Sequence, residues 1–183
     1  METRFRSDYS GEFVITETKW SGGKKTQTRE WVPNPIENHH ISGRAACIGS
    51  SIDKTFFDYT RLEKHRGGLL GSKKLQTYGV GEIAQEMRLD FTVETNVDHI
   101  NKIVNKKYHN ANIVYTNVRN CLAHPGEFYL IPYSPLLPTT ASIVYLAAFD
   151  EHKEVFLLGY YPETLISVRQ VFAAYPYTTF YLV

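Results

Sequence analysis

From about residue 43 onward, short apolar segments alternate with segments of helical periodicity, and this alternation limits the fold more than any other feature. The strand candidates are residues 44–48, 75–79, 90–94, 112–116, 127–131, 154–159 and 178–182, and the helix candidates are residues 59–65, 81–87, 97–107, 139–149 and 163–175. Strands that alternate with helices predict βαβ units. The expected fold class is therefore α/β, with a mostly parallel sheet, right-handed crossovers and helices on both faces.

Two of these segments carry the clearest patterns. Residues 155–158 are apolar at every position, which is typical of a strand buried on both faces of a parallel sheet. The segment 139–149 has apolar residues at helical spacing, and Thr139 or Thr140 is expected to cap the helix. We also expect the run 150–153, Asp-Glu-His-Lys, to be a solvated helix end that leads into the buried strand.

The N-terminal part has a different pattern. Residues 12–18 and 26–32 are rich in β-branched residues and flank the turn residues Ser21, Gly22 and Gly23, so they predict a β-hairpin. The hairpin is expected to project as an arm that lies on the main domain or on another subunit. Two prolines at 33 and 35 predict an extended linker. We therefore divide the chain into an arm with its linker, residues 1–35, and a main domain, residues 36–183.

Composition limits the partners. The 183 residues include 20 Lys and Arg against 19 Asp and Glu, a formal charge of +1, which gives no electrostatic reason to expect a nucleic acid or an anionic membrane. No apolar run is long enough for a membrane span. Thirteen tyrosines exceed what a core needs, and tyrosine is enriched at protein interfaces. We expect the partners to be other protein subunits, with a homo-oligomer possible.

The loop after the first strand of the main domain is the first place to look for a ligand, because ligands of parallel sheets bind beyond the carboxyl ends of the strands. It contains Gly49, Ser50, Ser51 and Lys54, which could present backbone N–H groups and one positive charge to a phosphate. A plain connection explains the same residues, since the loop has neither a GxGxxG nor a GxxxxGK[ST] pattern.

Other reactive residues have simple structural explanations. The histidines lack paired metal-ligand spacing, so surface or locally bonded roles are expected for His39, His40, His65, His99, His109, His124 and His152. Cys47 and Cys121 lack a CxxC pattern and are expected to be buried thiols. Cys121 and His124 could form a thiol–imidazole pair, although their loop position favours no catalytic role. No metal site and no cofactor are expected.

Several stretches resemble a family of small phage-encoded proteins. They are residues 43–49 (Gly-Arg-Ala-Ala-Cys-Ile-Gly), 57–58, 66–79 and 145–159. These phage proteins are in turn similar to Rossmann-like, nucleotide-sugar-using glycosyltransferases of the sialyltransferase type. The resemblance covers about residues 36–183 and implies a Rossmann-like domain, with the hairpin outside the shared part.

The ligand-binding motifs of that family are largely replaced here. After the first strand the family has Gly-Asn-Gly-x-Ser-Arg, of which this chain keeps Gly49, with Lys54 as a partial substitute for the arginine. The asparagine that follows the second family strand is Gly81 here, and Tyr160 and Tyr161 stand where the family has an aromatic residue and an aspartate. Ser51 adds a side chain, and Asp53 a negative charge, where a pyrophosphate would approach.

We therefore expect a non-catalytic phage structural or assembly protein that acts through protein–protein contacts on a degenerate glycosyltransferase-like scaffold, located in the virion or the host cytoplasm. One alternative is a nucleotide-sugar-dependent glycosyltransferase, in which Gly49, Ser50, Ser51 and Lys54 hold the diphosphate and Glu82 or Glu86 is the general base. The other is a host-directed inhibitor on the same scaffold.

Overall fold

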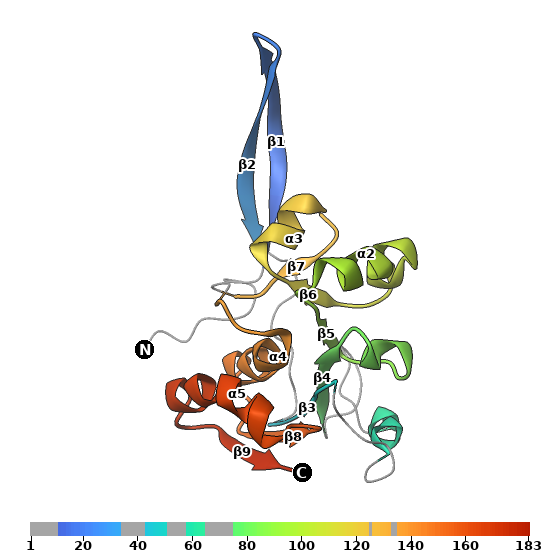
Figure 1. The fold of residues 1–183 in the computed structure, drawn as a ribbon, viewed down its shortest axis with the longest axis vertical. Helices are drawn as coiled ribbons and strands as arrows, with labels where there is room; N and C mark the ends of the chain where they lie inside the picture. Colours follow the sequence, from blue (N-terminus) through green and yellow to red (C-terminus); the bar gives the residue numbers. More distant parts are fainter. Residues whose placement is uncertain (1–10, 34–42, 51–57, 65–74, 125, 133–134) are drawn as a thin grey trace.

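The computed structural model describes residues 11–33, 43–50, 58–64, 75–124, 126–132 and 135–183 (Figure 1). The elements are β1 (Gly11–Ser21), β2 (Lys24–Pro33), β3 (Arg44–Ile48), η1 (Tyr59–Lys64), β4 (Gln76–Val80), η2 (Ile83–Gln85), β5 (Phe91–Val93), α2 (Val97–Asn105), η3 (Tyr108–Asn110), β6 (Val114–Thr116), α3 (Val118–Ala123), β7 (Tyr129–Leu130), α4 (Thr139–Phe149), β8 (Glu154–Leu158), α5 (Pro162–Ala174) and β9 (Thr179–Leu182).

Seven strands form one parallel sheet in the order β7-β6-β5-β4-β3-β8-β9. Every neighbouring pair in it is parallel. The chain first extends the sheet from β3 to β7 in one direction, then returns through α4 to β8 and β9 on the other side of β3. The order therefore reverses between β3 and β8, which makes that gap the topological switch point. The α/β, Rossmann-like prediction is confirmed.

The reversal also places the helices. Helix α4 packs over β3, β4, β5 and β8 and contacts α5, so these two helices cover one face. The connections from β4 to β7, which contain η2, α2 and α3, run the opposite way along the sheet, and right-handed crossovers put them on the other face. In Figure 1, α4 and α5 accordingly lie together, apart from α2 and α3.

The core lies mainly between the sheet and α4. Side chains from β3, β8 and α4, such as Cys47, Val155 and Ile143, are fully buried there. Helix α4 is buried almost all around, with seven of its eleven residues inaccessible, so it has no polar face to turn toward solvent. A second, smaller apolar cluster forms where α2 and α3 pack near β6 and β7, around Ile100, Cys121 and Phe128.

The N-terminal residues form the predicted antiparallel hairpin. Strands β1 and β2 pair from Gly11–Pro33 to Ser21–Lys24, and the turn uses Gly22 and Gly23 with φ of 57° and 74°, a region that favours glycine. The base of the hairpin contacts β7 and α3, while the rest extends away from the domain (Figure 1). The arm is therefore attached at the β7 edge of the sheet.

Several sequence predictions were wrong in detail. The helix expected at 59–65 is the 3₁₀ segment η1, and the one expected at 81–87 is reduced to the three residues of η2. The strand expected at 127–131 contains only Tyr129–Leu130. Helix α3 was not predicted, because its six residues are too few to show apolar periodicity. The predicted cap of α4 is also absent: Pro138 occupies the N-cap position without a side-chain hydrogen bond.

The prediction that residues 150–153 form a solvated helix end was wrong for two of its four residues. Asp150 and His152 are 0% and 1% exposed. The hydroxyl of Tyr78, on β4, donates to Asp150 Oδ2 at 2.5 Å and lies 2.9 Å from His152 Nε2. The tyrosine supplies the polar partner that makes burial of both side chains possible. Glu151 and Lys153, between and after them, are exposed as expected.

Tyr78→Phe is expected to lower the free energy of unfolding by about 1–3 kcal/mol, because Asp150 loses a donor in a site without solvent access. Urea denaturation followed by circular dichroism at pH 7 measures this. Tyr177→Phe is the control, since Tyr177 is 96% exposed and its change should cost no more than about 0.5 kcal/mol. Equal stability of the two variants would contradict a structural role for the Tyr78 hydroxyl.

Candidate functional site

The carboxyl ends of β3 and β8 meet at the switch point, where a nucleotide lies in folds of this kind. Of the four residues predicted to hold a diphosphate, the structure describes two. Gly49 is buried directly after β3, and its N–H donates to Leu158 O of β8 at 2.9 Å. Ser50 is exposed in the following turn. Ser51 and Lys54 lie outside the described residues.

Tyr160 packs into the switch point itself. It follows β8, is 4% exposed, and donates a hydrogen bond from its hydroxyl to Thr140 O near the start of α4, at 2.9 Å. A Cβ on Gly49 would lie 3.0 Å from Gly159 O and 3.4 Å from the Tyr160 ring. A side chain at position 49 would therefore meet both the Gly159 carbonyl and the tyrosine ring. Burial, and secondarily Cys47, raises the pKa of Tyr160 well above its usual value.

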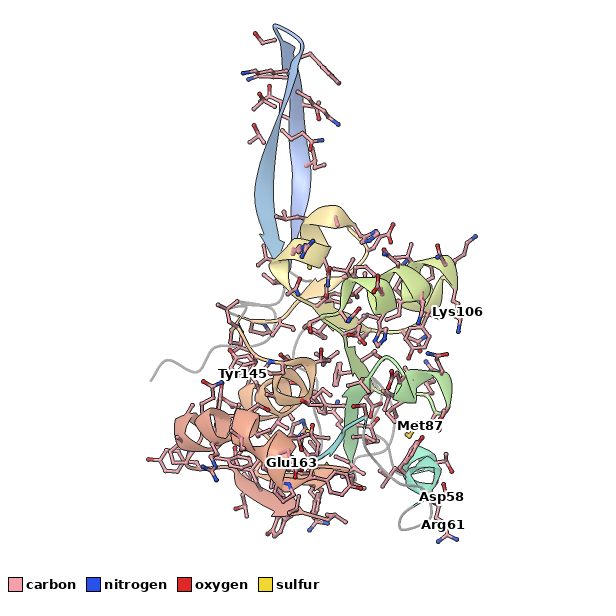
Figure 2. The ribbon with its side chains drawn as sticks, viewed as in Figure 1. Asp58, Arg61, Met87, Lys106, Tyr145 and Glu163 are labelled. Carbon is pink, nitrogen blue, oxygen red and sulfur yellow. The ribbon has the colours of Figure 1, made fainter. Side chains whose placement is uncertain are left out.

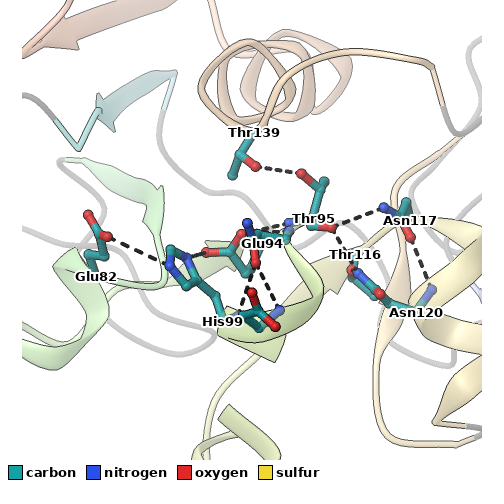
Figure 3. Close-up of polar contacts among 10 residues, drawn as sticks. Glu82, Glu94, Thr95, His99, Thr116, Asn117, Asn120 and Thr139 are labelled. Carbon is teal, nitrogen blue, oxygen red and sulfur yellow. Dashed lines mark hydrogen bonds and ion pairs between the residues drawn. The ribbon is translucent and has the colours of Figure 1, made fainter. Parts of the chain in front are cut away.

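A second group of polar residues lies along the same edge of the sheet, after β5 (Figure 3). Glu94 is 2% exposed, and its carboxylate bonds to residues that follow it closely in the chain. Its Oε1 accepts the backbone N–H groups of Thr95 and Asn96, both at 2.9 Å. Two backbone donors on one oxygen allow the carboxylate to be buried without a cation.

The other carboxylate oxygen of Glu94 holds His99, in the first turn of α2. Glu94 Oε2 lies 3.0 Å from His99 Nδ1. Because a carboxylate only accepts, Nδ1 carries the proton, and Nε2 is the ring atom left to face outward. Glu82, after β4, has its Oε1 3.9 Å from His99 Nε2. The side chains of Glu94, His99 and Glu82 thus form a series that leads from the interior to the surface.

The residues after β6 complete this cluster. The carbonyl of Thr95 accepts hydrogen bonds from the side chains of Asn117 and Asn120, at 3.3 and 3.1 Å. The hydroxyl of Thr95 lies 2.5 Å from Thr139 Oγ1, at the start of α4, and the two hydroxyls share a hydrogen bond. Asn96 and Asn117 also accept backbone N–H groups at the starts of α2 and α3. These contacts connect three helix starts to two strand ends.

A pocket of about 140 Å³ lies beside His99, between α2 and the segment that contains η2. Its lining residues are Gly81, Glu82, Ala84, Gln85, His99, Lys102, Ile103, Lys106 and Tyr108. Lys106, labelled in Figure 2, donates to Gln85 Oε1 at 3.0 Å across it. Sites for ligands of drug or nucleotide size occupy about 300–1,000 Å³. The volume beside His99 suits only a molecule much smaller than a nucleotide sugar.

The remaining predicted residues are engaged locally. Glu86, the second candidate base, accepts a hydrogen bond from Tyr59. His109 lies 3.4 Å from Glu127, and His124 packs edge-on against Phe128. Cys121 belongs to the small apolar cluster, and burial raises the pKa of Cys47 above its usual range. Within the described ranges, no three His, Cys, Asp or Glu side chains are arranged to hold a metal. His39, His40 and His65 lie outside these ranges.

Sequence reasoning did not single out Glu94 or the pairing of Glu94 with His99. One signal was present: Glu94 is the last residue of the predicted strand 90–94, at the end where parallel sheets place functional groups. Asn96, a typical N-cap residue, follows two positions later and indicates that the helix begins there.

Comparison with known proteins adds no identification. No family model, no curated protein and no solved structure matches this chain. Among the described residues, no helix has the length and apolar character required to cross a bilayer.

We expect His99 to carry its proton on Nδ1, with Nε2 unprotonated, in the neutral form of the ring. Two-dimensional ¹⁵N–¹H correlation of the imidazole above pH 8 distinguishes the two tautomers. Glu94→Gln is expected to shift His99 toward the other tautomer and to lower the free energy of unfolding by about 1–3 kcal/mol, because a buried amide replaces the acceptor. A dominant Nε2–H tautomer in the unmodified protein would contradict the assigned Glu94–His99 bond.

Proposed function

We propose that this chain is a non-catalytic phage structural or assembly protein that acts through contacts with other proteins, on a glycosyltransferase-like α/β scaffold that no longer holds a nucleotide. The observation that carries the proposal is the group of large apolar side chains exposed on and beside α5 and β9, next to the β9 edge of the sheet. The phage assignment rests on the sequence resemblance.

The closed switch point argues against nucleotide binding in terms of free energy. A diphosphate that entered beside Gly49, in the space that the Tyr160 ring fills, would displace the ring and break its bond to Thr140. Removing a buried aromatic side chain from its packing site costs about 3 kcal/mol. Such a cost reduces affinity about 100-fold, and the loss of the Gly-Asn-Gly-x-Ser-Arg contacts reduces it further.

The surface supports a role in protein contacts. Of the large apolar side chains that the described residues expose, most lie on α5, on β9 or beside them: Tyr161, Ile166, Tyr177, Tyr181, Leu182 and Val183. We call this set the α5–β9 surface. β9 is also the last strand in the described sheet order, so its outer edge has no strand beside it there. Exposed apolar groups next to a sheet edge are typical of a protein interface.

A second candidate function, the nucleotide-sugar-dependent transferase, is favoured by one observation. Glu82, a predicted general base, lies beside His99, whose ring Glu94 orients. An acid–imidazole pair of this kind is suited to proton transfer. The small volume beside it and the closed switch point make this function secondary.

Isothermal titration calorimetry with uridine, cytidine and guanosine diphosphate and monophosphate sugars tests the loss of nucleotide binding. We expect no dissociation constant below 1 mM, because most of the family's Gly-Asn-Gly-x-Ser-Arg motif is replaced here and Tyr160 packs against the end of β3. Ser51→Trp serves as a site control, since it adds bulk to the loop where the family binds its donor. Sub-millimolar binding that Ser51→Trp abolishes would overturn the proposal and favour the transferase.

Quantitative mass spectrometry of purified phage particles tests the assembly role. We expect the chain at a fixed copy number, and Leu182→Asp is expected to reduce incorporation at least tenfold, because it places a charge on the α5–β9 surface. Asn101→Asp, at an exposed position of α2, adds the same charge elsewhere and should leave incorporation unchanged. Absence from particles together with a stoichiometric complex with a host protein would favour the host-directed inhibitor.

A further inference from the structure

The distal part of the β1–β2 arm has a composition unlike the rest of the chain. Residues 17–28 include three lysines, Lys19, Lys24 and Lys25, and a single acidic residue, Glu17. This segment therefore carries +2, whereas the whole chain carries +1 and the remainder −1. The near-neutral total conceals a local positive charge at the end of the arm. We call residues 17–28 the arm tip.

The arm tip is held away from the domain. Strand β1 has eleven residues, which at about 3.3 Å each gives an arm about 35 Å long. Only its base contacts β7 and α3 (Figure 1). Nearly all residues of the arm tip are exposed, and in Figure 2 its side chains project from both sides of the ribbon.

Trp20 is the one large apolar side chain of the arm tip, and it is 71% exposed. The ammonium group of Lys25 lies 6.0 Å from the centroid of the Trp20 ring. The indole is therefore free to stack on a partner, with a cation held next to it. The aromatic face and the adjacent positive charge form a pair that suits a flat aromatic group carrying negative charge nearby.

The register places lysines on both faces of the ribbon. Trp20 pairs with Lys25, and Ser21 with Lys24. Because side chains alternate between faces, Trp20 and Lys25 share one face, while Lys19 and Lys24 share the other. Lys19 Nζ lies 2.9 Å from Glu17 Oε1, an exposed ion pair that a phosphate can replace at little cost. A ribbon that enters a groove can therefore place a cation toward each wall. A flat partner would meet the lysines of one face only.

We propose that the arm tip binds nucleic acid, with Lys19, Lys24 and Lys25 on backbone phosphates and Trp20 against a base. The major groove of B-form DNA, about 12 Å wide, admits a two-stranded ribbon. Lysine, threonine, serine and glutamine, which make up most of the arm tip, are the types that contact phosphates. Protein interfaces are depleted in lysine, and one tryptophan is too little apolar surface for a membrane anchor. The binding does not depend on the assembly role proposed above.

Fluorescence anisotropy with a labelled 20-base-pair duplex and a labelled 20-nucleotide single strand tests the proposal on the full chain. At 50 mM salt we expect dissociation constants of about 1–100 µM. Three phosphate contacts give a slope of about −2.7 in log affinity against log salt, which is an approximately 40-fold loss between 50 and 200 mM. Preference for the duplex indicates groove entry, and preference for the single strand indicates stacking on unpaired bases.

Replacing Lys19, Lys24 and Lys25 together by alanine is expected to remove the salt dependence and to weaken binding at least 30-fold. The matched control replaces Arg88, Lys153 and Arg169, three exposed cations of the domain, and should leave the slope unchanged. Trp20→Ala is expected to weaken single-strand binding about tenfold, and Trp20→Phe to restore most of it.

Three results would overturn the proposal. The first is no binding to either nucleic acid at 100 µM protein and 50 mM salt, and the second is a loss of affinity in the control variant equal to that in the arm-tip variant. The third is binding to vesicles that contain phosphatidylserine but to neither nucleic acid. Circular dichroism shows whether the arm-tip variants keep the fold, and their exposed positions give no reason for them to lose it.

Discussion

The close approach of β3 and β8 at the switch point governs what this domain can do. Gly49 has no side chain, which allows its backbone to lie against Gly159 and the Tyr160 ring, and its N–H extends the β3–β8 pairing by one more bond. The same contact lies at the carboxyl edge of the sheet, the place where parallel sheets of this order bind their ligands. Packing of Tyr160 there stabilises the centre of the sheet.

The polar groups that follow β5 and β6 form hydrogen bonds to other residues of the protein. Glu94 accepts two backbone N–H groups and one imidazole N–H, and the carbonyl of Thr95 accepts two amide donors. In a ligand-binding edge, groups of this kind face outward and stay partly unsatisfied until a substrate arrives. Here they connect the starts of α2, α3 and α4 to β5 and β6. A small pocket lies beside His99, next to this group.

The sequence predicts the order of the strands along the chain because burial on both faces leaves a strong local pattern, as in residues 44–48 and 154–158. It predicts short elements poorly, and α3 has too few residues for periodicity to appear. Asp150, His152 and Tyr160 bond to residues 72, 74 and 20 positions away, and Glu94 orients His99, 5 positions away. Tyr78 makes the burial of Asp150 possible, and no pattern near Asp150 indicates it. The candidate site was therefore predictable only as a location, the carboxyl edge of the sheet.

The arm contains one irregularity with consequences for its direction. Ile15 pairs with Arg29 and Glu17 with Thr28, so Thr16 is an extra residue, a β-bulge, between the base and the arm tip. A bulge increases local twist, and side chains alternate with a period of two. Deleting this single residue would keep the pairing and the faces of the more distal residues, and it would remove the local twist and bend that the bulge adds, while leaving the domain untouched. Loss or gain of one residue at this position can therefore change the direction of the arm during evolution. The sheet to which the arm is attached need not change.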